Sequence, residues 1–430
     1  MIHDEPLSAV ADALRTGRIE PTAYLETIRE RAETVEPDIE ALLDEPDRWN
    51  RAFETADALA DEYPISADRP PLFGVPIGVK DIFHVDGMET KAGSELPPEA
   101  LTGGEAAAVT ALKSAGAIVL GKTVTTEFAC FEPGPTRNPH DIDHTPGGSS
   151  SGSAAAVASG LCPLAFGSQT IGSTIRPAAF CGIVGFVASY GRIPTDGVIP
   201  VSESLDHVGI FTQDTEGIRL AAPLLCDDWR TLPSPTERPT LGVPRGPYLE
   251  QASETGRESF EKSVSALRSA GYEIEEIQLL EDIEAINERH ERLMAAEAAI
   301  VHDGWYEAYR ERYSEQFLDL LETGRSVPTA DVAAATRSRP ELRARLARVM
   351  GEYGIDLWIA PSATGPAPEG IDSTGDPIMN LPWTHAGVPT IGLPSDTMDG
   401  LPLGVQFAGR YGADEDVVRW SHGLADALSE

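Results

Sequence analysis

Pro146–Gly160 has the sequence Pro-Gly-Gly-Ser-Ser-Ser-Gly-Ser-Ala-Ala-Ala-Val-Ala-Ser-Gly, a glycine turn with three consecutive serines followed by small apolar residues. Serine is favoured at helix N-termini, so the stretch predicts a helix over Ala154–Ala158 that starts at the serines. One interpretation is that Ser149, Ser150 and Ser151 only cap this helix. Two further stretches favour a different role, because they supply what a reactive serine needs.

The first of these stretches is Gly78–Asp81, in which Lys80 follows an apolar segment rich in Gly and Pro. Lys80 either ends a strand with its ammonium in solvent or is a buried amine. Burial lowers the pKa of lysine by several units and makes it a usable base. The second stretch is Gly167–Gly182, where Ser173 follows Gly172 at the start of a helix. Several backbone N–H groups then surround one point, which suits an oxyanion; the alternative is a simple turn.

The 430 residues include 69 Asp and Glu but only 33 Lys and Arg, for a formal net charge of −36. An acidic surface repels phosphate backbones, so we expect no direct nucleic-acid binding. Because the acidic residues are spread along the whole chain, we expect a halophilic protein from an acidic proteome, in which salt screens the self-repulsion. The alternative is a local acidic patch that serves a basic partner.

Hydrophobic residues make up 41% of the chain, which indicates a globular protein. There is no run of about 18 apolar residues and no basic, apolar leader, so we expect a soluble, cytoplasmic protein without membrane contact. Cys130, Cys162, Cys181 and Cys226 show no C-x-x-C spacing, and the nine histidines are scattered. We therefore expect free thiols, no metal site and no cofactor.

Helical and strand patterns alternate along the chain, which predicts a single α/β domain over residues 1–430 with helices on both faces of the sheet. Its expected sections are a helical lead-in, a core, a mostly helical section and a return to the core sheet, at residues 1–62, 65–225, 240–349 and 350–430. A Pro-, Thr- and Ser-rich linker is expected at 231–245. Strands are expected at 70–79, 117–120, 183–187, 272–277 and 356–360, and helices at 105–114 and 258–270.

Two familiar motifs occur in an unsuitable context. Gly116–Thr123 has the spacing of a phosphate-binding loop, but its middle residues are themselves a strand and a helix precedes it. Gly148–Gly152 matches a nucleophile elbow with Ser150 as nucleophile, but polar sequence precedes it where an apolar strand is required. Asp206 and His207 would complete such a triad, which stays a minor alternative.

Together, the lysine, the serine turn and the run Gly172–Gly182 resemble the amidase signature family, closely over Phe73–Asp214 and more weakly over Asp356–Gln406. The resemblance implies an α/β amidase-signature fold, with a mixed central β-sheet surrounded by helices. It also implies an amidase that forms an acyl-enzyme with a Ser-Ser-Lys triad. Ser173 would be the nucleophile, Ser149 the bridging serine and Lys80 the base, with a cis peptide between Gly148 and Ser149.

The resemblance also implies an oxyanion hole made by the backbone N–H groups of Thr170, Ile171, Gly172 and Ser173. Position 171 is usually glycine in the family, so a β-branched residue there would be strained if the backbone needed a positive φ. Ser150 and Ser151 are expected to support the loop through hydrogen bonds.

The Ile-Arg-Pro-Ala-Ala run resembles members of a malonamidase-like subgroup that act on small carboxylated amides. Arg176 would pair with the substrate carboxylate; the alternative is a structural ion pair. Gln169 is expected to bind substrate as well, and a weak family likeness near the C-terminus places the segment Asn380–Thr384, with Trp383 as its substrate-binding residue, at the pocket. The expected partner is therefore a small amide, with a homodimer possible.

Two other functions remain open. The first is the glutaminase component of the tRNA-dependent amidotransferase, its A subunit, whose chains are longer and typically have S-I-R-Q-P where this chain has T-I-R-P-A at 174–178. The second is a non-catalytic binding protein that retains the same fold.

Overall fold

The computed structural model describes residues 1–3 and 6–429. Its centre is a ten-stranded sheet in the order β2-β1-β3-β5-β4-β9-β10-β8-β6-β7. In chain order the strands are β1 (Pro76–Lys80), β2 (Ile118–Thr123), β3 (Leu164–Gln169), β4 (Val184–Val187), β5 (His207–Thr212), β6 (Leu241–Arg245), β7 (Ile274–Gln278), β8 (Leu357–Pro361), β9 (Thr390–Met398) and β10 (Leu401–Ala408). Pairing is parallel at both ends of the sheet and antiparallel in the middle. The mixed α/β fold is therefore confirmed.

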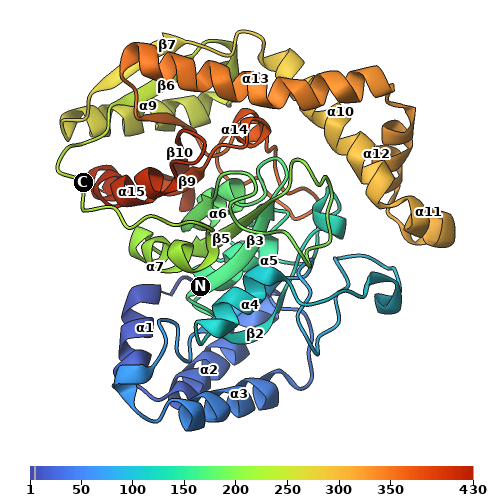
Figure 1. Cartoon of the computed structure of the whole chain (residues 1–430), viewed down its shortest axis with the longest axis vertical. Coiled ribbons are helices and arrows are strands. Elements are labelled where there is room, and N and C mark those ends of the chain that lie inside the picture. The colour runs from blue at the N-terminus through green and yellow to red at the C-terminus, as the bar shows by residue number, and fades with distance from the viewer. Residues whose placement is uncertain (4–5, 430) are drawn as a thin grey trace.

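The helices of the N-terminal half enclose one end of the sheet (Figure 1). They are α1 (Leu7–Arg15), α2 (Pro21–Ile39), α3 (Arg48–Glu62), α4 (Ala107–Ser114), α5 (Ser151–Ala158), α6 (Ile175–Cys181) and α7 (Thr215–Leu225), with 3-10 turns η1 (Ser66–Asp68), η2 (Pro98–Leu101) and η3 (Glu127–Ala129). The first three form the predicted helical lead-in and lie together at the blue end of the molecule.

The helices of the C-terminal half cover the other end of the sheet (Figure 1). They are α8 (Pro247–Glu250), α9 (Glu254–Ser269), α10 (Ile283–Val301), α11 (Asp303–Tyr309), α12 (Glu315–Ser326), α13 (Thr329–Tyr353), α14 (Leu381–Ala386) and α15 (Asp414–Ser429), with the 3-10 turn η4 (Arg310–Arg312). Helices α10 to α13 account for the stretch predicted to be mostly helical. Ser253 caps α9 and Ser314 caps α12, each by accepting a backbone N–H with its side chain.

One predicted boundary is wrong: the linker expected at 231–245 ends in a strand, β6 (Leu241–Arg245). Pro244 weakens the strand pattern in the sequence, because proline cannot donate to a sheet ladder. The structure accommodates it, since β6 pairs with β8 only through Leu241 and Gly242 while its full length pairs with β7. The other predicted strands are present, with ends shifted by a few residues.

Helix α5 is buried along its whole length, because its residues are small enough for close packing. A Cβ at Gly152 would collide with the backbone of Ala41 and Val124. Glycine there lets the helix approach the chain after β2, and Ser153 donates to the Phe166 carbonyl of β3 at 2.7 Å. The start of α5 is thereby fixed beside the end of β1.

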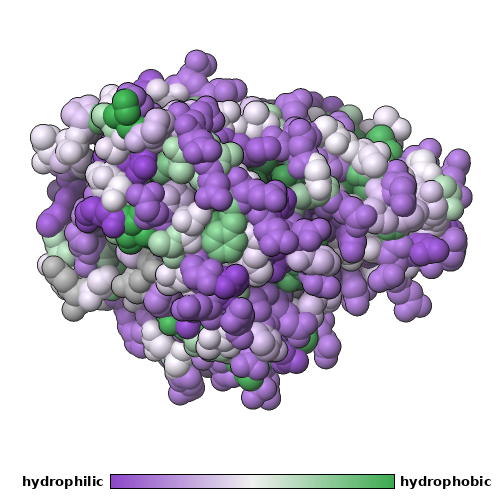
Figure 2. Space-filling view, turned by 90° about the horizontal axis from the view of Figure 1, so that it is seen from below, coloured by the Kyte–Doolittle hydropathy of each residue, from purple (hydrophilic) through white to green (hydrophobic). Residues whose placement is uncertain are grey.

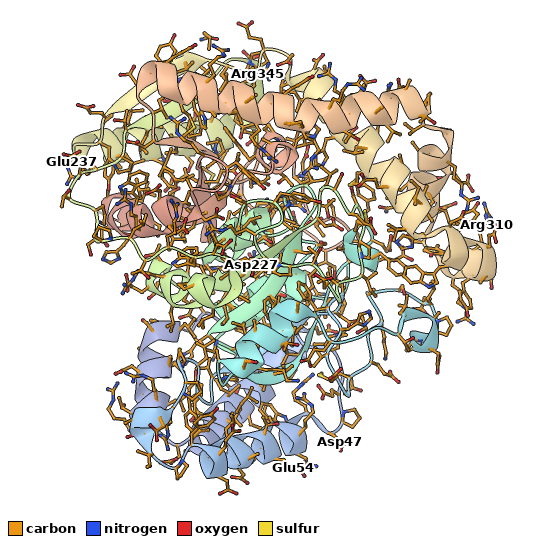
Figure 3. The ribbon with its side chains drawn as sticks, viewed as in Figure 1. Asp47, Glu54, Asp227, Glu237, Arg310 and Arg345 are labelled. Atoms are coloured by element: carbon orange, nitrogen blue, oxygen red, sulfur yellow. The ribbon has the colours of Figure 1, made fainter. Side chains whose placement is uncertain are left out.

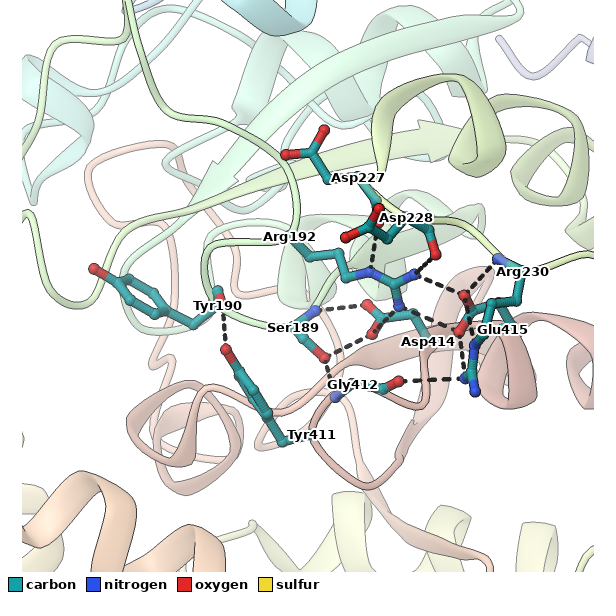
Figure 4. Close-up of polar contacts among 10 residues, drawn as sticks. All are labelled: Ser189, Tyr190, Arg192, Asp227, Asp228, Arg230, Tyr411, Gly412, Asp414 and Glu415. Carbon is teal, nitrogen blue, oxygen red and sulfur yellow. Dashed lines mark hydrogen bonds and ion pairs between the residues drawn. The ribbon is translucent and has the colours of Figure 1, made fainter.

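A polar clasp joins the C-terminal helix α15 to the loop after β4 (Figure 4). Asp414 accepts hydrogen bonds from the backbone N–H and the hydroxyl of Ser189, both at 2.7 Å. Arg192 lies 2.6 Å from Glu415, which also pairs with Arg230 at 3.0 Å. Both carboxylates are almost completely buried, so the clasp fixes the last helix onto the core.

The surface is strongly polar. The face in Figure 2 is covered mainly by hydrophilic side chains, with small, separate hydrophobic patches. Charged side chains such as Asp47, Glu54, Glu237 and Arg310 lie exposed around the outer edge of the molecule (Figure 3). Within the described residues, no helix combines the length and the apolar character needed to span a bilayer.

Candidate active site

Lys80 is the last residue of β1, and its side chain is completely buried. β1 lies between β2 and β3, and α5 packs against it. The Lys80 Nζ lies 2.7 Å from Ser149 Oγ, 3.0 Å from Ser150 Oγ and 2.8 Å from Ser168 Oγ. Of the two interpretations of this lysine, the structure shows the buried amine.

Burial lowers the pKa of Lys80 to about 7, because the interior disfavours the ammonium form. The negative charges that Asp206 and Cys130 can carry act in the opposite direction. Among residues 1–3 and 6–429, no carboxylate makes an ion pair with Lys80. A large fraction of the amine is therefore uncharged near neutral pH.

The serine turn depends on its glycines. The peptide between Gly148 and Ser149 is cis, as predicted, and Gly147 has a φ of +83°. A Cβ at Gly147 would lie 2.8 Å from Pro177 Cα, and one at Gly148 would lie 2.6 Å from the Thr374 methyl group. Glycine allows α6 and the loop before α14 to pack directly on the turn.

The serines of this turn face inward, so the interpretation as a simple helix cap is wrong. Ser150 is the residue before α5, but its side chain makes no cap hydrogen bond. Its Oγ accepts from Lys80 and from the Ser168 N–H at 3.2 Å, and its hydroxyl donates to the Ser168 carbonyl at 3.3 Å. Ser151 donates to the Val124 carbonyl at 3.5 Å. Ser150 therefore ties the turn to β1 and β3, and Ser151 ties it to the residue after β2.

Ser173 lies in the loop between β3 and α6, and 8% of its surface is exposed. In the part of the chain that the structure describes, the N–H groups of Thr170, Ile171, Gly172 and Ser173 donate to no protein acceptor. Four consecutive free donors next to a hydroxyl can stabilise a negatively charged oxygen. Ile171 is not among the described non-glycine residues with positive φ, so its side chain causes no backbone strain of that kind.

Side chains from distant segments fix this loop. The Gln169 Oε1 accepts the N–H groups of Thr174 and Ile175 at 3.0 and 3.1 Å, and its amide donates to Thr384 Oγ1 at 3.0 Å. The Thr384 hydroxyl donates to the Ile171 carbonyl at 2.6 Å. Gln169 is predicted to bind substrate, but in the structure its amide oxygen and its amide nitrogen both form hydrogen bonds with other protein groups.

A cavity of about 70 Å³ opens at the two serines. Its walls come from the serine turn, the loop after β3, α10 and the loop before α14, and include Ser149, Ser173, Ile171, Met294 and Pro377. No hydrogen bond joins the Ser149 and Ser173 hydroxyls among the contacts of the described residues, but both border this cavity. The cavity is far smaller than pockets for drug-sized ligands, which are about 300–1,000 Å³.

Arg176, in the first turn of α6, is buried and also lines the cavity. It donates to the Gly148 carbonyl at 2.6 Å, to Thr374 Oγ1 at 3.2 Å and to the Gly375 carbonyl. Burial lowers its pKa to about 10, with the charge of Asp376 acting in the opposite direction. No ion pair of Arg176 occurs within residues 1–3 and 6–429, so the predicted alternative of a structural ion pair is wrong.

Trp383 lies outside the cavity wall formed by the described residues, contrary to expectation. It sits in α14, is completely buried and donates its indole N–H to Tyr248 Oη at 2.9 Å. Its ring packs edge-on against Tyr248, with centroids 5.8 Å apart. The Trp383 side chain is therefore part of the hydrophobic core and does not face the pocket.

The competing nucleophiles are poorly placed or inactive. Cys130 lines the cavity, but burial raises the pKa of its thiol to about 12, so the thiolate is absent near neutral pH. His207 is bonded to the Leu205 carbonyl at 2.6 Å rather than to Ser150. All four cysteines are free, and the described residues contain no cluster of His, Cys, Asp and Glu suited to a metal.

Ser168 also shapes this site and was not predicted to do so, whereas Asn380 and Thr384 belong to the segment 380–384 that a weak family likeness placed at the pocket, and Asp206 was considered only as part of an alternative triad. Asn380 lies against Gly172, where an added Cβ would collide with its side chain. Successive side chains of a strand point to opposite faces of the sheet, so Ser168 and Gln169 in β3 face opposite sides. This alternation is the one sequence signal for the orientation of Ser168. The other three are remote in sequence from the loop that they support.

Comparisons with known proteins agree with this architecture. The sequence profile of the Amidase family matches residues 23–418. The A subunit of the glutamyl-tRNA(Gln) amidotransferase from Koribacter versatilis is 28% identical, covering 98% of this chain and 98% of that protein. The corresponding protein of Exiguobacterium sibiricum is 30% identical, covering 82% of this chain and 83% of that protein.

A solved amidase crystal structure superposes with a TM-score of 0.88 at 33% identity, covering 98% of this chain and 99% of that one. A peptide amidase from Stenotrophomonas maltophilia has a TM-score of 0.82 at 23% identity, which supports the fold alone. The chain therefore belongs to the amidase family, the amidase-signature enzymes that act on amide C–N bonds.

Proposed function

We propose that this enzyme hydrolyses a small carboxamide to an acid and ammonia or an amine, with Ser173 as nucleophile, Ser149 as bridging serine and Lys80 as base. The main support is the position of the buried Lys80 amine, 2.7 Å from Ser149, whose hydroxyl borders the same cavity as Ser173. Such an arrangement activates a serine without histidine.

The contacts of Lys80 also fit its neutral form, the form that acts as the base. Ser150 directs its own proton to the Ser168 carbonyl, so Ser150 Oγ has to accept from Lys80. A neutral amine has two protons, which serve Ser150 and Ser168, and one lone pair, which is left for the Ser149 proton. The lowered pKa of Lys80, about 7, makes this form accessible.

The reaction then proceeds by acyl transfer. Ser173 Oγ attacks the amide carbon, its proton passes to Ser149, and the Ser149 proton passes to Lys80. The C–N bond breaks as the leaving nitrogen takes a proton back through Ser149. Water attacks the acyl-enzyme by the same route, which breaks the ester bond and restores the Ser173 hydroxyl. The Ser149–Ser173 hydrogen bond forms with substrate bound, as is common for catalytic contacts that are long in unliganded enzymes.

The free N–H groups of Thr170, Ile171, Gly172 and Ser173 would hold the oxyanion of both tetrahedral intermediates. The absence of positive φ at Ile171 supports this role, because the backbone conformation tolerates a side chain there.

For the substrate we propose a small amide that carries a carboxylate, as in the malonamidase-like subgroup. The small cavity supports a small acyl group. The Arg176 guanidinium faces it without a carboxylate partner in the described residues, and its buried Nε has no hydrogen bond. A carboxylate would supply the missing counter-charge.

The direct test is a screen of small amides with purified wild-type protein and Ser173→Ala, together with labelling by a fluorophosphonate. We expect hydrolysis and labelling of the wild type, and loss of both in Ser173→Ala. An unlabelled wild type without hydrolysis would instead support a non-catalytic binding protein of the same fold.

A second candidate is the glutaminase component of a glutamyl-tRNA(Gln) amidotransferase, in which the same chemistry would release ammonia from glutamine within an assembly. The curated relatives favour it over the free amidase, since those compared are proteins of this kind at 27–30% identity. It implies protein partners. Hydrolysis of simple amides by the purified single chain would support the free amidase, whereas activity only with partner proteins would support the amidotransferase.

A further inference from the structure

Asp206, the residue before β5, binds the loop after β3 and an adjacent backbone turn with the two oxygens of its carboxyl group. Its Oδ1 accepts the Thr170 hydroxyl at 2.6 Å. Its Oδ2 accepts the backbone N–H groups of Val201 and Ser202 at 2.8 and 3.0 Å. All three partners are uncharged, and no ion pair of Asp206 occurs among the described residues.

This carboxyl group lies on the opposite side of the loop from the Ser149–Ser173 cavity. A second cavity of about 400 Å³ is lined by Asp206, Ser168 and Thr170, and Thr170 also borders the first cavity. Ser168 is one of the three hydroxyls that bind the Lys80 amine. Asp206 therefore lines the same cavity as a direct hydrogen-bond partner of Lys80.

The titratable groups near Asp206 come from four directions. Lys80 extends from β1, Cys130 follows η3, Tyr190 follows β4, and Glu297 extends from α10. Burial raises the pKa of Asp206 to about 6, with Glu297 acting in the same direction and its three hydrogen bonds opposing it. Lys80 is the cationic member of this group, and the charge of Asp206 raises the pKa of Lys80 against the effect of burial.

We propose that Asp206 is a positioning residue for the hydrolytic reaction: it holds the oxyanion loop through Thr170 and places a negative charge near Lys80. The inference rests on the proposed function, and it assigns two separable effects to one carboxylate. The hydrogen bond to Thr170 fixes the donors that face the oxyanion. The charge keeps the Lys80 amine basic enough to accept the serine proton.

Two variants separate these effects, measured as pH–rate profiles of kcat and kcat/KM. Thr170→Val removes the loop contact but keeps the carboxylate, so we expect kcat to fall about tenfold or more, with an acidic inflection that moves much less than in Asp206→Asn. Asp206→Asn removes the charge, so we expect the inflection to move to lower pH by about one unit and kcat to fall. Asp206→Glu should restore the inflection.

The matched control is Asp196→Asn, which removes an exposed carboxylate lining the same second cavity and should leave the profile unchanged. A wild-type inflection retained in Asp206→Asn, with unchanged kcat in Thr170→Val, would overturn the inference. Fluorophosphonate labelling of the wild type distinguishes the two proposals: without it the hydrolytic function itself fails, and with it only the role of Asp206 is refuted.

Discussion

Lys122 Nζ lies 2.6 Å from Asp81 Oδ1, and both side chains are buried, at 4% and 1% exposure. Asp81 directly follows Lys80, and Lys80 pairs across β1 and β2 with Thr123, the residue after Lys122. Two buried lysines at the ends of neighbouring strands thus have different partners. Lys122 has a carboxylate, and Lys80 has only hydroxyls within hydrogen-bonding distance.

The Lys122–Asp81 pair should therefore be structural. Asp81→Asn leaves the Lys122 ammonium buried without its counter-charge, and we expect it to lower the free energy of unfolding by about 3–5 kcal/mol. The double variant Asp81→Asn/Lys122→Met removes both charges and should regain most of that loss. Denaturant unfolding of the three proteins checks this, and an equal loss in the double variant would contradict it.

The rate of hydrolysis should depend on the protonation state of Lys80. Below its pKa of about 7 the amine is charged and cannot accept the Ser149 proton, so we expect kcat/KM to fall about tenfold for each pH unit below that value. Above it the rate should level off. Because the Asp206 carboxyl titrates nearby, at about 6, the observed inflection belongs to the pair. A flat profile from about one pH unit below to one above the Lys80 pKa would exclude Lys80 as the base.

Arg176 should discriminate between charged and neutral amides. A hydrogen-bonded carboxylate contributes about 1.5–3 kcal/mol, so Arg176→Ala should lower kcat/KM for a carboxylated amide about 10- to 100-fold more than for its neutral analogue. Both should fall somewhat, because Arg176 also holds Gly148, Thr374 and Gly375. An equal loss for both substrates would show that the residue serves only the loop.

Ile171 should limit the size of the acyl group. Its side chain lines the cavity beside Met294 and the two serines, so Ile171→Ala enlarges the space next to the nucleophile. We expect the variant to prefer longer acyl chains than the wild type in a series of linear amides, measured by kcat/KM. Met294→Leu, which conserves volume, provides the control. Identical chain-length profiles would refute this role.

The melting temperature should rise with molar KCl. With a net charge of −36, self-repulsion destabilises the folded chain at low ionic strength, and salt at about 1 M reduces the screening length to about 3 Å. Thermal unfolding followed by circular dichroism, from about 0.1 M to about 1 M KCl and beyond, checks this. A melting temperature that stays constant or falls would contradict adaptation to high salt.

Local sequence predicted the elements of the fold better than it predicted the surroundings of the site. The small residues of α5 and the apolar β-branched residues of β2 were sufficient to indicate a helix and a strand. Pro244 concealed β6, since the strand pairing that tolerates it is a long-range property. The roles of Lys80, Ser149 and Ser173 came from a motif resemblance and stay predictions.

The residues around these three were harder to predict, because their positions depend on tertiary contacts. Thr384 supports the loop at Ile171 from more than two hundred positions away in the chain; a weak family likeness placed its segment at the pocket, but nothing in the sequence indicates this hydrogen bond. For Trp383, a weak family likeness suggested a residue of the pocket wall. In the structure its indole N–H instead donates to Tyr248 inside the protein.

The central sheet cannot form completely during translation until β9 has been synthesised, because β9 pairs with β4. Phe186 and Val187 emerge from the ribosome early, whereas their partners in β9, Ile391 and Thr390, are translated much later. Until then the nascent chain carries an unpaired apolar edge, a template for intermolecular association. Shielding of this edge is therefore a requirement of biosynthesis as well as of the folded state.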